Sequence, residues 1–252
     1  MTGLRPALWL AGVVVLTGTA GASAAPFAYI PNDLSNDVSV LDIATNTVVA
    51  TVPAVGLLPQ GVAVSPDGSH AYVTSEHSNT VSVIAWVTNA AGASVPTVVA
   101  TVPVGDGPIG VAVTPDGSHV YVTNWSTDTV GVIETASNSL VDVVLVGSKP
   151  EGVAVTPDGK SVYVVNTGDN TVSVINPSTN LVVATVPVGL VSQSAAVGLH
   201  PQGLAVTHDG KSVYVANTNA NTMSVIATAT NTVVATVPAG NGPVAFGNFI
   251  GP

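Results

Sequence analysis

The sequence predicts an all-β fold, and more specifically a β-propeller built from four-stranded antiparallel blades. Three observations predict it: each tyrosine stands at the same place in a repeated phrase, each repeat holds four short valine-rich runs between turn residues, and no segment shows the period of a helix. The repeating unit is about forty residues long, with two insertions, which is typical of propeller blades. The five tyrosines are Tyr29, Tyr72, Tyr121, Tyr163 and Tyr214.

The unit that begins at Pro108 illustrates how each blade is predicted. Its first strand, Gly110–Val113, is a continuous apolar run, as expected for a strand buried on both faces near the centre of a ring. The turn Pro115-Asp116-Gly117 follows, because proline presets the first turn dihedral, Asp bonds to its own backbone and Gly accepts a positive φ. The Tyr121 strand and the Thr129–Val132 strand come next.

The fourth strand of each unit is predicted to lie at the outer edge of its blade. A proline follows this run, and proline ends strand pairing and discourages a further strand from adding at an edge. The runs are Val48–Val52, Val98–Val102, Val182–Val186 and Val233–Val237.

Strand counting predicts five blades and a ring closed by both ends of the chain. The segment Pro243–Phe249 resembles an innermost strand but has no tyrosine strand after it, whereas the chain enters the fold at Phe27 with a tyrosine strand that has no inner strand before it. We therefore expect the C-terminal strand to pair with the N-terminal blade. The alternatives are an incomplete seven-bladed ring that needs a partner chain, an open β-solenoid and a two-sheet sandwich.

Four phrases carry a family resemblance. Tyr121–Asn124, Asn79–Ile84, Ala44–Pro53 and Gly152–Gly159 closely resemble the YVTN-type β-propeller repeat family of bacterial and archaeal cell-envelope proteins. The likeness covers residues 27–250. It implies the propeller fold and says little about function, because the signature residues belong to turns and strands. Many relatives have seven blades, whereas this chain has five units by count.

The first 25 residues have the pattern of a secretory signal peptide. A single basic residue, Arg5, precedes the apolar run Ala7–Leu16, and small residues end the segment at Ala25. The apolar run is about half of the ~20 residues that a membrane span needs, which disfavours the alternative of an uncleaved anchor. We expect a leader at 1–25, a single propeller domain at 26–252 and no transmembrane span in the mature chain. The protein is then exported to the periplasm, the cell surface or the medium.

The charge balance excludes several classes of partner. The chain has 4 Lys+Arg against 14 Asp+Glu, a formal net charge of −10. Nucleic-acid binding depends on Lys and Arg that neutralise phosphates, so this class is not expected. There is no cysteine, which excludes disulfides, thiolate metal sites and a cysteine nucleophile.

Binding residues are expected on one face of the propeller, where the interblade loops and the loops between second and third strands open together. Trp125 is an aromatic candidate for stacking on a sugar or anchoring a protein, although it could equally cover the channel mouth. The candidates on this face are Asp33, Glu76, His77, Trp125, Asp128, Asp169, Asp106, Lys149 and Gln202.

A divalent metal is the one cofactor that the sequence suggests, and only weakly. Glu76 and His77 form the most metal-like pair, His200 lies in the longest interblade insertion, and Glu151 could add a carboxylate from an inner strand. Plain solvated turns are the competing interpretation of the loop residues, and no other cofactor is expected.

The function predicted from the sequence is a non-enzymatic binding or scaffolding module of the cell envelope. No serine lies in a Gly-x-Ser-x-Gly elbow, and no other catalytic constellation is evident. The expected partners are an envelope protein or a surface glycan, and the chain is expected to be a monomer. The alternative is a metal-dependent hydrolase or lactonase with its site on the loop face; it would place acidic residues on the inner strands, where only Glu151 comes close. A redox-associated accessory protein is a third alternative.

Overall fold

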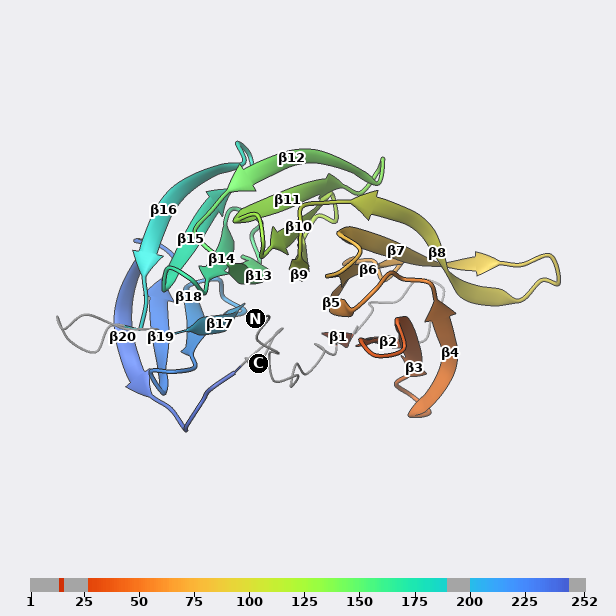
Figure 1. The fold of residues 1–252 in the computed structure, drawn as a ribbon, viewed down its shortest axis with the longest axis horizontal. Helices are drawn as coiled ribbons and strands as arrows, with labels where there is room; N and C mark the ends of the chain where they lie inside the picture. The colour runs from red at the N-terminus through yellow and green to blue at the C-terminus, as the bar shows by residue number, and fades with distance from the viewer. Residues whose placement is uncertain (1–13, 16–26, 190–199, 245–252) are drawn as a thin grey trace, which may run out of the picture.

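The computed structural model describes residues 14–15, 27–189 and 200–244. In these ranges the regular structure is all β, and the strands form five four-stranded antiparallel sheets. The sheets follow one another around an arc, with the first strand of each sheet innermost (Figure 1). The predicted fold class, an all-β propeller of four-stranded antiparallel blades, is confirmed.

Each sheet is a meander in chain order. The first contains β1 (Val14–Val15), β2 (Phe27–Asn32), β3 (Asp37–Asp42) and β4 (Thr47–Pro53). The second contains β5 (Pro59–Val64), β6 (His70–Ser75), β7 (Thr80–Thr88) and β8 (Ser94–Pro103). The third contains β9 (Pro108–Val113), β10 (His119–Asn124), β11 (Thr129–Glu134) and β12 (Ser139–Leu145). The fourth contains β13 (Pro150–Val155), β14 (Val162–Asn166), β15 (Thr171–Asn176) and β16 (Leu181–Pro187). The fifth contains β17 (Pro201–Val206), β18 (Ser212–Asn217), β19 (Thr222–Ala227) and β20 (Thr232–Pro238).

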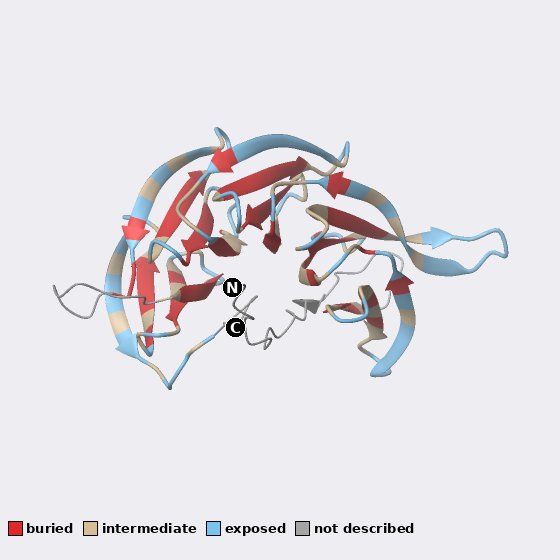
Figure 2. Ribbon diagram, viewed as in Figure 1, coloured by how far each residue is buried: buried red, intermediate tan, exposed pale blue. Residues whose placement is uncertain are grey.

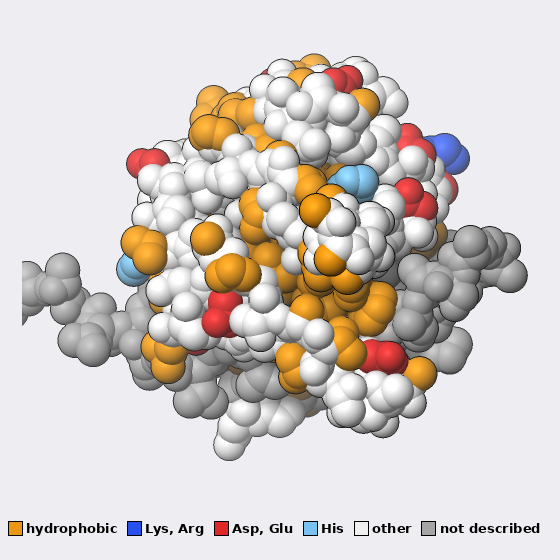
Figure 3. Space-filling model, turned by 90° about the vertical axis from the view of Figure 1, so that its right-hand side faces the viewer, with side chains coloured by type: hydrophobic (Ala, Val, Ile, Leu, Met, Phe, Trp, Pro, Cys, Tyr) orange, Lys and Arg blue, Asp and Glu red, His pale blue; other side chains and the backbone are white. Residues whose placement is uncertain are grey.

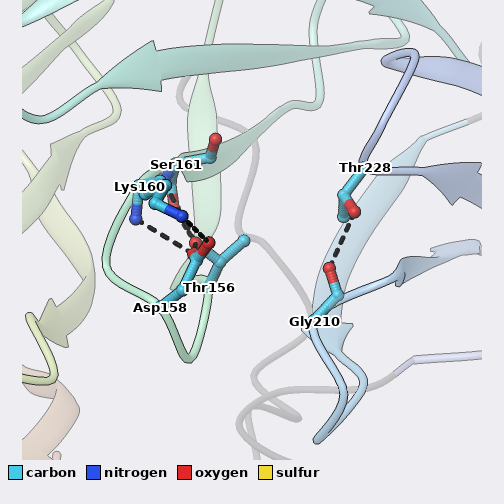
Figure 4. A network of polar contacts seen from close by, with 6 residues as sticks. All are labelled: Thr156, Asp158, Lys160, Ser161, Gly210 and Thr228. Carbon is cyan, nitrogen blue, oxygen red and sulfur yellow. Dashed lines mark hydrogen bonds and ion pairs between the residues drawn. The ribbon is translucent and has the colours of Figure 1, made fainter.

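The turn between the first two strands of a sheet is held by its aspartate, as the sequence predicts. In the fourth sheet Thr156 Oγ1 donates to Asp158 Oδ1 at 2.7 Å, and the Lys160 backbone N–H donates to the same oxygen at 3.1 Å (Figure 4). The Lys160 ammonium lies 3.2 Å from the second carboxylate oxygen. Gly159 takes a φ of 69°, which closes the hairpin.

The core lies between neighbouring sheets, and the repeated tyrosines connect them. Figure 2 shows that burial is most continuous along the second and third strands of the sheets, whereas the outermost strands carry most of the exposed strand residues. Tyr121 and Tyr163 are fully buried, and their hydroxyls donate to Asn180 Oδ1 and Asn231 Oδ1 of the following sheet at 2.9 and 2.6 Å. Tyr214 is only half-buried, since the described residues place no sheet after the one it belongs to.

A threonine of the second strand fastens the inner strands of neighbouring sheets. Thr74 Oγ1 donates to the carbonyl of Ile109 at 2.7 Å, and Thr123 Oγ1 donates to the carbonyl of Glu151 at 2.8 Å. The backbones approach closely here: a Cβ added to Gly152 would lie 2.8 Å from the Gln202 carbonyl oxygen. These bonds fix the positions of the inner strands, and therefore of the side chains that the inner strands carry.

The ring closure predicted from the sequence is not tested by the described residues. The C-terminal segment 245–252, which should supply most of the closing strand, lies outside them, as do most of the predicted leader and the loop 190–199. At the inner edge of β2 the structure instead has β1, which pairs Val14 with Tyr29 and Val15 with Ala28. Among the described residues no helix is long and apolar enough to cross a membrane.

Candidate functional site

Loops of two kinds meet on one face and bond to each other through their backbones. The Trp125 N–H donates to the Gly107 carbonyl at 2.9 Å, and the Thr167 N–H donates to the Lys149 carbonyl at 3.0 Å. The same contact joins Glu76 to Leu58. Each interblade loop thus lies against the loop between the second and third strands of the sheet it leads into. We call the surface formed by these loops and the start of the inner strands the rim.

A second repeated contact joins each sheet to the interblade loop that follows it. An Asn or Asp with positive φ precedes each third strand, and its side-chain oxygen accepts from the N–H of the residue before the inner proline. The Lys149 N–H donates to Asp128 Oδ1 at 2.8 Å, and the His200 N–H donates to Asn170 Oδ1 at 3.1 Å. Lys149 and His200 are themselves held at φ values of 54° and 50°, a conformation in which most side chains are strained.

Three acids that the sequence analysis singled out for binding also hold loops together. Besides Asp128, the carboxylate of Asp106 accepts from Asn79 Nδ2 at 3.0 Å, and Asp169 accepts from the Ser148 N–H at 2.6 Å. Sequence reasoning missed these roles because each partner lies in another loop, 21 or 27 residues away. Asp33 lies in the β2–β3 turn, half-buried, and His77 is exposed in the β6–β7 loop.

Trp125 contacts the one lysine of the rim. The side chain of Trp125 is half-buried, and the Lys149 ammonium lies 5.0 Å from the centre of its ring, a cation–π contact. In this structure the ring of Trp125, a candidate either for contacting a ligand or for covering the channel mouth, therefore contacts a neighbouring side chain.

Polar side chains stand at one equivalent position of three inner strands, directly after the inner proline. This position holds Gln60 on β5, Glu151 on β13 and Gln202 on β17, with Ile109 on β9. Glu151 is 1% exposed, and in the described part of the chain it is the only buried carboxylate. The repeated Pro-x-Gly pattern is the signal that could have found Gln60, which the sequence analysis missed.

Each of the two glutamines bonds to the first residue of the adjoining loop. Gln60 Nε2 donates to Glu76 Oε2 at 3.2 Å, while Gln202 Oε1 accepts from Thr218 Oγ1 at 3.1 Å. Gln202 Nε2 also lies 3.3 Å from His200 Nε2. Since the amide can only donate there, the imidazole nitrogen accepts, which leaves the ring proton of neutral His200 on Nδ1.

An apolar cavity of about 330 Å³, which we call the channel, lies between the inner strands β5, β9, β13 and β17. It begins two residues after the polar position on β5, β13 and β17, so the polar position and the lining of the cavity lie on the same strands. The lining residues are Val62, Ala63, Val64, Val111, Ala112, Val153, Ala154, Val155, Pro157, Leu204, Ala205, Val206 and His208.

The weak metal candidates are not gathered into one cluster. Among the residues that the structure describes, no three His, Asp or Glu side chains come together so that they could hold a metal ion. Glu76 bonds to Gln60, and His200 lies beside Gln202. The divalent-metal site of Glu76, His77, His200 and Glu151 stays a prediction.

The family of the chain follows from a match to a known family over most of its length. The profile of the family described as "Lactonase, 7-bladed beta-propeller" matches residues 48–180 and 148–238, which together span most of the chain. The chain belongs to this family. No curated protein matches the sequence of this lactonase-family propeller at a significant level.

Solved structures share the fold of this lactonase-family protein. A functionally unknown protein from Desulfotomaculum acetoxidans is 22% identical, with a TM-score of 0.69 and coverage of 88% of this chain and 72% of that chain. A protein from Bacteroides uniformis proposed to be a 6-phosphogluconolactonase is 18% identical, with a TM-score of 0.68 and coverage of 86% and 69%. Hydrazine synthase from Kuenenia stuttgartiensis is 20% identical, with a TM-score of 0.58 and coverage of 86% and 84%. At these identities the likeness shows the fold alone.

The family match overturns the predicted function. The interpretation as a non-enzymatic binding or scaffolding module is wrong, because the matched family is one of lactonases, which are enzymes. The Val-Ala-Val runs of the inner strands favoured that interpretation because they contain no acidic residue, whereas Glu151 stands two residues before such a run.

Proposed function

We propose that this protein is a hydrolase that opens the ring of a lactone at the rim of the channel, with Glu151 as the general base. One observation carries the proposal: a carboxylate that is 1% exposed stands at the start of an inner strand, beside the apolar channel of a lactonase-family propeller. Buried ionisable groups concentrate at functional sites in clefts, which makes a buried carboxylate at the start of an inner strand a candidate catalytic group.

The chemistry requires a base, a stabiliser of negative charge and a proton donor. Glu151 takes a proton from a water molecule as the water oxygen attacks the lactone carbonyl carbon. The tetrahedral oxyanion then collapses, the bond between the carbonyl carbon and the ring oxygen breaks, and Glu151 gives the proton that it took from water to the ring oxygen. The sum is one lactone and one water giving one hydroxycarboxylic acid.

The neighbouring rim residues assist in the other two roles. Gln202 lies on the inner strand adjacent to that of Glu151, and its amide is held by hydrogen bonds to Thr218 and His200. The amide can therefore present an N–H to the developing oxyanion. The His200 imidazole is oriented by Gln202, with its proton on Nδ1, and can donate a hydrogen bond from Nδ1 to the leaving ring oxygen while Glu151 returns the proton that it took from water. Thr123 fixes the Glu151 backbone through its carbonyl.

The test compares two carboxylate-to-amide variants of the rim. Hydrolysis of a panel of γ- and δ-lactones is followed by acid release, with and without a chelator. Glu151→Gln should lower kcat/KM at least about 100-fold, as expected for loss of a general base. The matched control Asp37→Asn, beside the β2–β3 loop, keeps an oxygen that accepts from Asn32 and Ser35 and should retain activity. Full activity of Glu151→Gln, or no hydrolysis by the wild type, would overturn the proposal, and the chelator arm tests the predicted divalent metal.

Three further sequence-based interpretations remain proposals. The repeat phrases support a YVTN-type repeat within the wider propeller family. Residues 1–25 support export as a secretory leader, and hence a periplasmic or extracellular location. The N-terminal sequence of protein recovered from outside the cytoplasm would test both cleavage and location.

A further inference from the structure

The channel suggests which lactones the proposed enzyme takes. Resting on the proposed function, we propose that the substrate is an uncharged lactone with an aliphatic tail, whose ring lies at Glu151 and whose tail lies in the channel between the inner strands. Three observations carry this: the lining of the channel, its position relative to Glu151, and the scarcity of cations.

The channel is lined by aliphatic side chains, together with Pro157 and the imidazole of His208. Its volume of about 330 Å³ falls within the range of small-molecule pockets. Valines and alanines from four successive inner strands supply most of the wall, and small side chains stand at the same middle position of each strand. These are Ala63, Ala112, Ala154 and Ala205. Their small size leaves the space that a tail would fill, and such a wall offers hydrophobic stabilisation without selecting a polar group.

The polar and apolar parts lie in the order that a tailed lactone needs. On β13 the buried Glu151 comes two residues before Val153, the first residue of that strand to line the channel. Two residues of β-strand span roughly 7 Å. Gln202 and Leu204 repeat this arrangement on β17. A ligand with a carbonyl group at one end and methylenes at the other matches both parts at once.

The charge of the protein disfavours a phosphorylated substrate. The whole chain contains 4 Lys+Arg against 14 Asp+Glu, and phosphate groups are normally recognised by Arg and Lys. The ammonium of Lys149 contacts the Trp125 ring. Figure 3, which views the molecule from the right-hand side of Figure 1, likewise shows blue Lys and Arg side chains only at one edge. An anionic substrate would also be repelled by the net charge of −10.

The experiment uses a series of γ-lactones that differ only in tail length. Hydrolysis is measured for γ-lactones from the unsubstituted ring to an eight-carbon tail, together with 6-phosphogluconolactone. Binding of 2-alkylcyclopentanones with the same tails, which cannot be hydrolysed, is measured by calorimetry. Each buried methylene should raise kcat/KM and affinity roughly three- to fourfold until the channel is full.

Two variants locate the tail. Ala112→Phe places a ring in the channel. In this variant kcat/KM and ketone affinity should hardly change with each added methylene. Ala44→Phe makes the same substitution in the exposed β3–β4 turn and should leave the gain unchanged. Thermal melting of both variants identifies a loss of folding, and if Ala112→Phe does not fold, Ala112→Leu replaces it.

The outcomes separate the two proposals. Hydrolysis with no dependence on tail length would mean that the channel is closed to ligands, which overturns this inference and leaves the proposed function standing. Tail-dependent binding of the ketones without hydrolysis of any lactone would overturn the proposed function alone. A preference for the phosphorylated lactone, or a gain per methylene that persists in Ala112→Phe, would overturn the inference.

Discussion

At the scale of single residues, the residue before each inner proline has an unusual backbone conformation. This position has a positive φ in each interblade loop: Leu58, Gly107, Lys149, His200 and Gly242. Glycine adopts such a φ without strain, whereas other residues pay on the order of 1 kcal/mol. Leucine, lysine and histidine occupy this position despite the strain, and His200 is the one whose side chain lies against Gln202 of the proposed site.

His200→Gly should therefore preserve stability while it reduces activity. The strain is relieved, but the unfolded chain gains freedom, so the free energy of unfolding should change by less than about 1 kcal/mol. The imidazole beside Gln202 is lost, so kcat/KM for lactones should fall roughly 10- to 100-fold. Leu58→Gly, with the same backbone conformation, should leave kcat/KM unchanged. Denaturant unfolding and steady-state kinetics measure both; an unimpaired His200→Gly would remove His200 from the mechanism.

The turn aspartates predict how stability depends on acid. Hydrogen bonds from Ser65 and the Ser69 backbone hold the pKa of Asp67 down to about 2, and those from Thr114 and Ser118 do the same for Asp116. A carboxyl whose pKa is lower in the folded state stabilises the fold above its ordinary pKa, and that contribution is lost as the pH falls toward the folded pKa. The melting temperature should thus decline between about pH 4 and pH 2.

Asp116→Asn should make the acid decline less steep while it lowers the melting temperature at neutral pH. Both carboxylates are largely exposed, so the change for one residue is small and is best measured as a difference in slope between variant and wild type. An identical decline in the variant would show that other groups cause the acid sensitivity.

At the scale of elements, threonines that join neighbouring inner strands also position the proposed base. Thr123 accepts from the Gly110 N–H at 2.7 Å and donates to the Glu151 carbonyl at 2.8 Å. Thr74 makes the equivalent pair of bonds, to Gly61 and Ile109, at 2.8 and 2.7 Å. The two threonines are equally buried, so they offer a matched comparison.

Thr123→Val should cost stability and activity, whereas Thr74→Val should cost only stability. Valine fits this position, because Val165 occupies it in the fourth sheet. Each variant leaves a backbone N–H and a carbonyl without their partner, at a cost of about 1–3 kcal/mol. Only in Thr123→Val does the freed carbonyl belong to Glu151, so kcat/KM should fall several-fold there. Equal activity in the two variants would mean that the Glu151 backbone needs no such support.

The elements were predictable from the sequence to the extent that local chemistry determines them. Proline, aspartate and glycine specify the hairpin at Pro115–Gly117, and the apolar run of Gly110–Val113 identifies an inner strand. The roles of Asp128 and Glu151 were not predictable in the same way. Both carboxylates belong to similar repeats, and only the stacking of sheets places one against the Lys149 backbone and buries the other beside the channel.

At the scale of the whole molecule, acids outnumber bases and are rarely paired with them. The net charge is −10, and the ion pairs found in the described ranges are Lys160 with Asp158 and Lys211 with Asp209, each within one exposed turn. Exposed pairs of this kind contribute little. The dominant electrostatic effect on stability should therefore be repulsion among carboxylates, which favours the unfolded chain.

Moderate salt should consequently stabilise the protein. At about 0.1 M ionic strength the screening length is roughly 10 Å, which weakens repulsion between loops but leaves short hydrogen bonds intact. If screening contributes on the order of 1 kcal/mol, the melting temperature should rise by roughly 2–4 °C between low salt and about 0.2 M sodium chloride. Potassium chloride at the same ionic strength should give the same rise, since screening depends on charge and not on the identity of the ion. A melting temperature that falls with salt would mean that attractive ion pairs outweigh the repulsion, and would contradict this account.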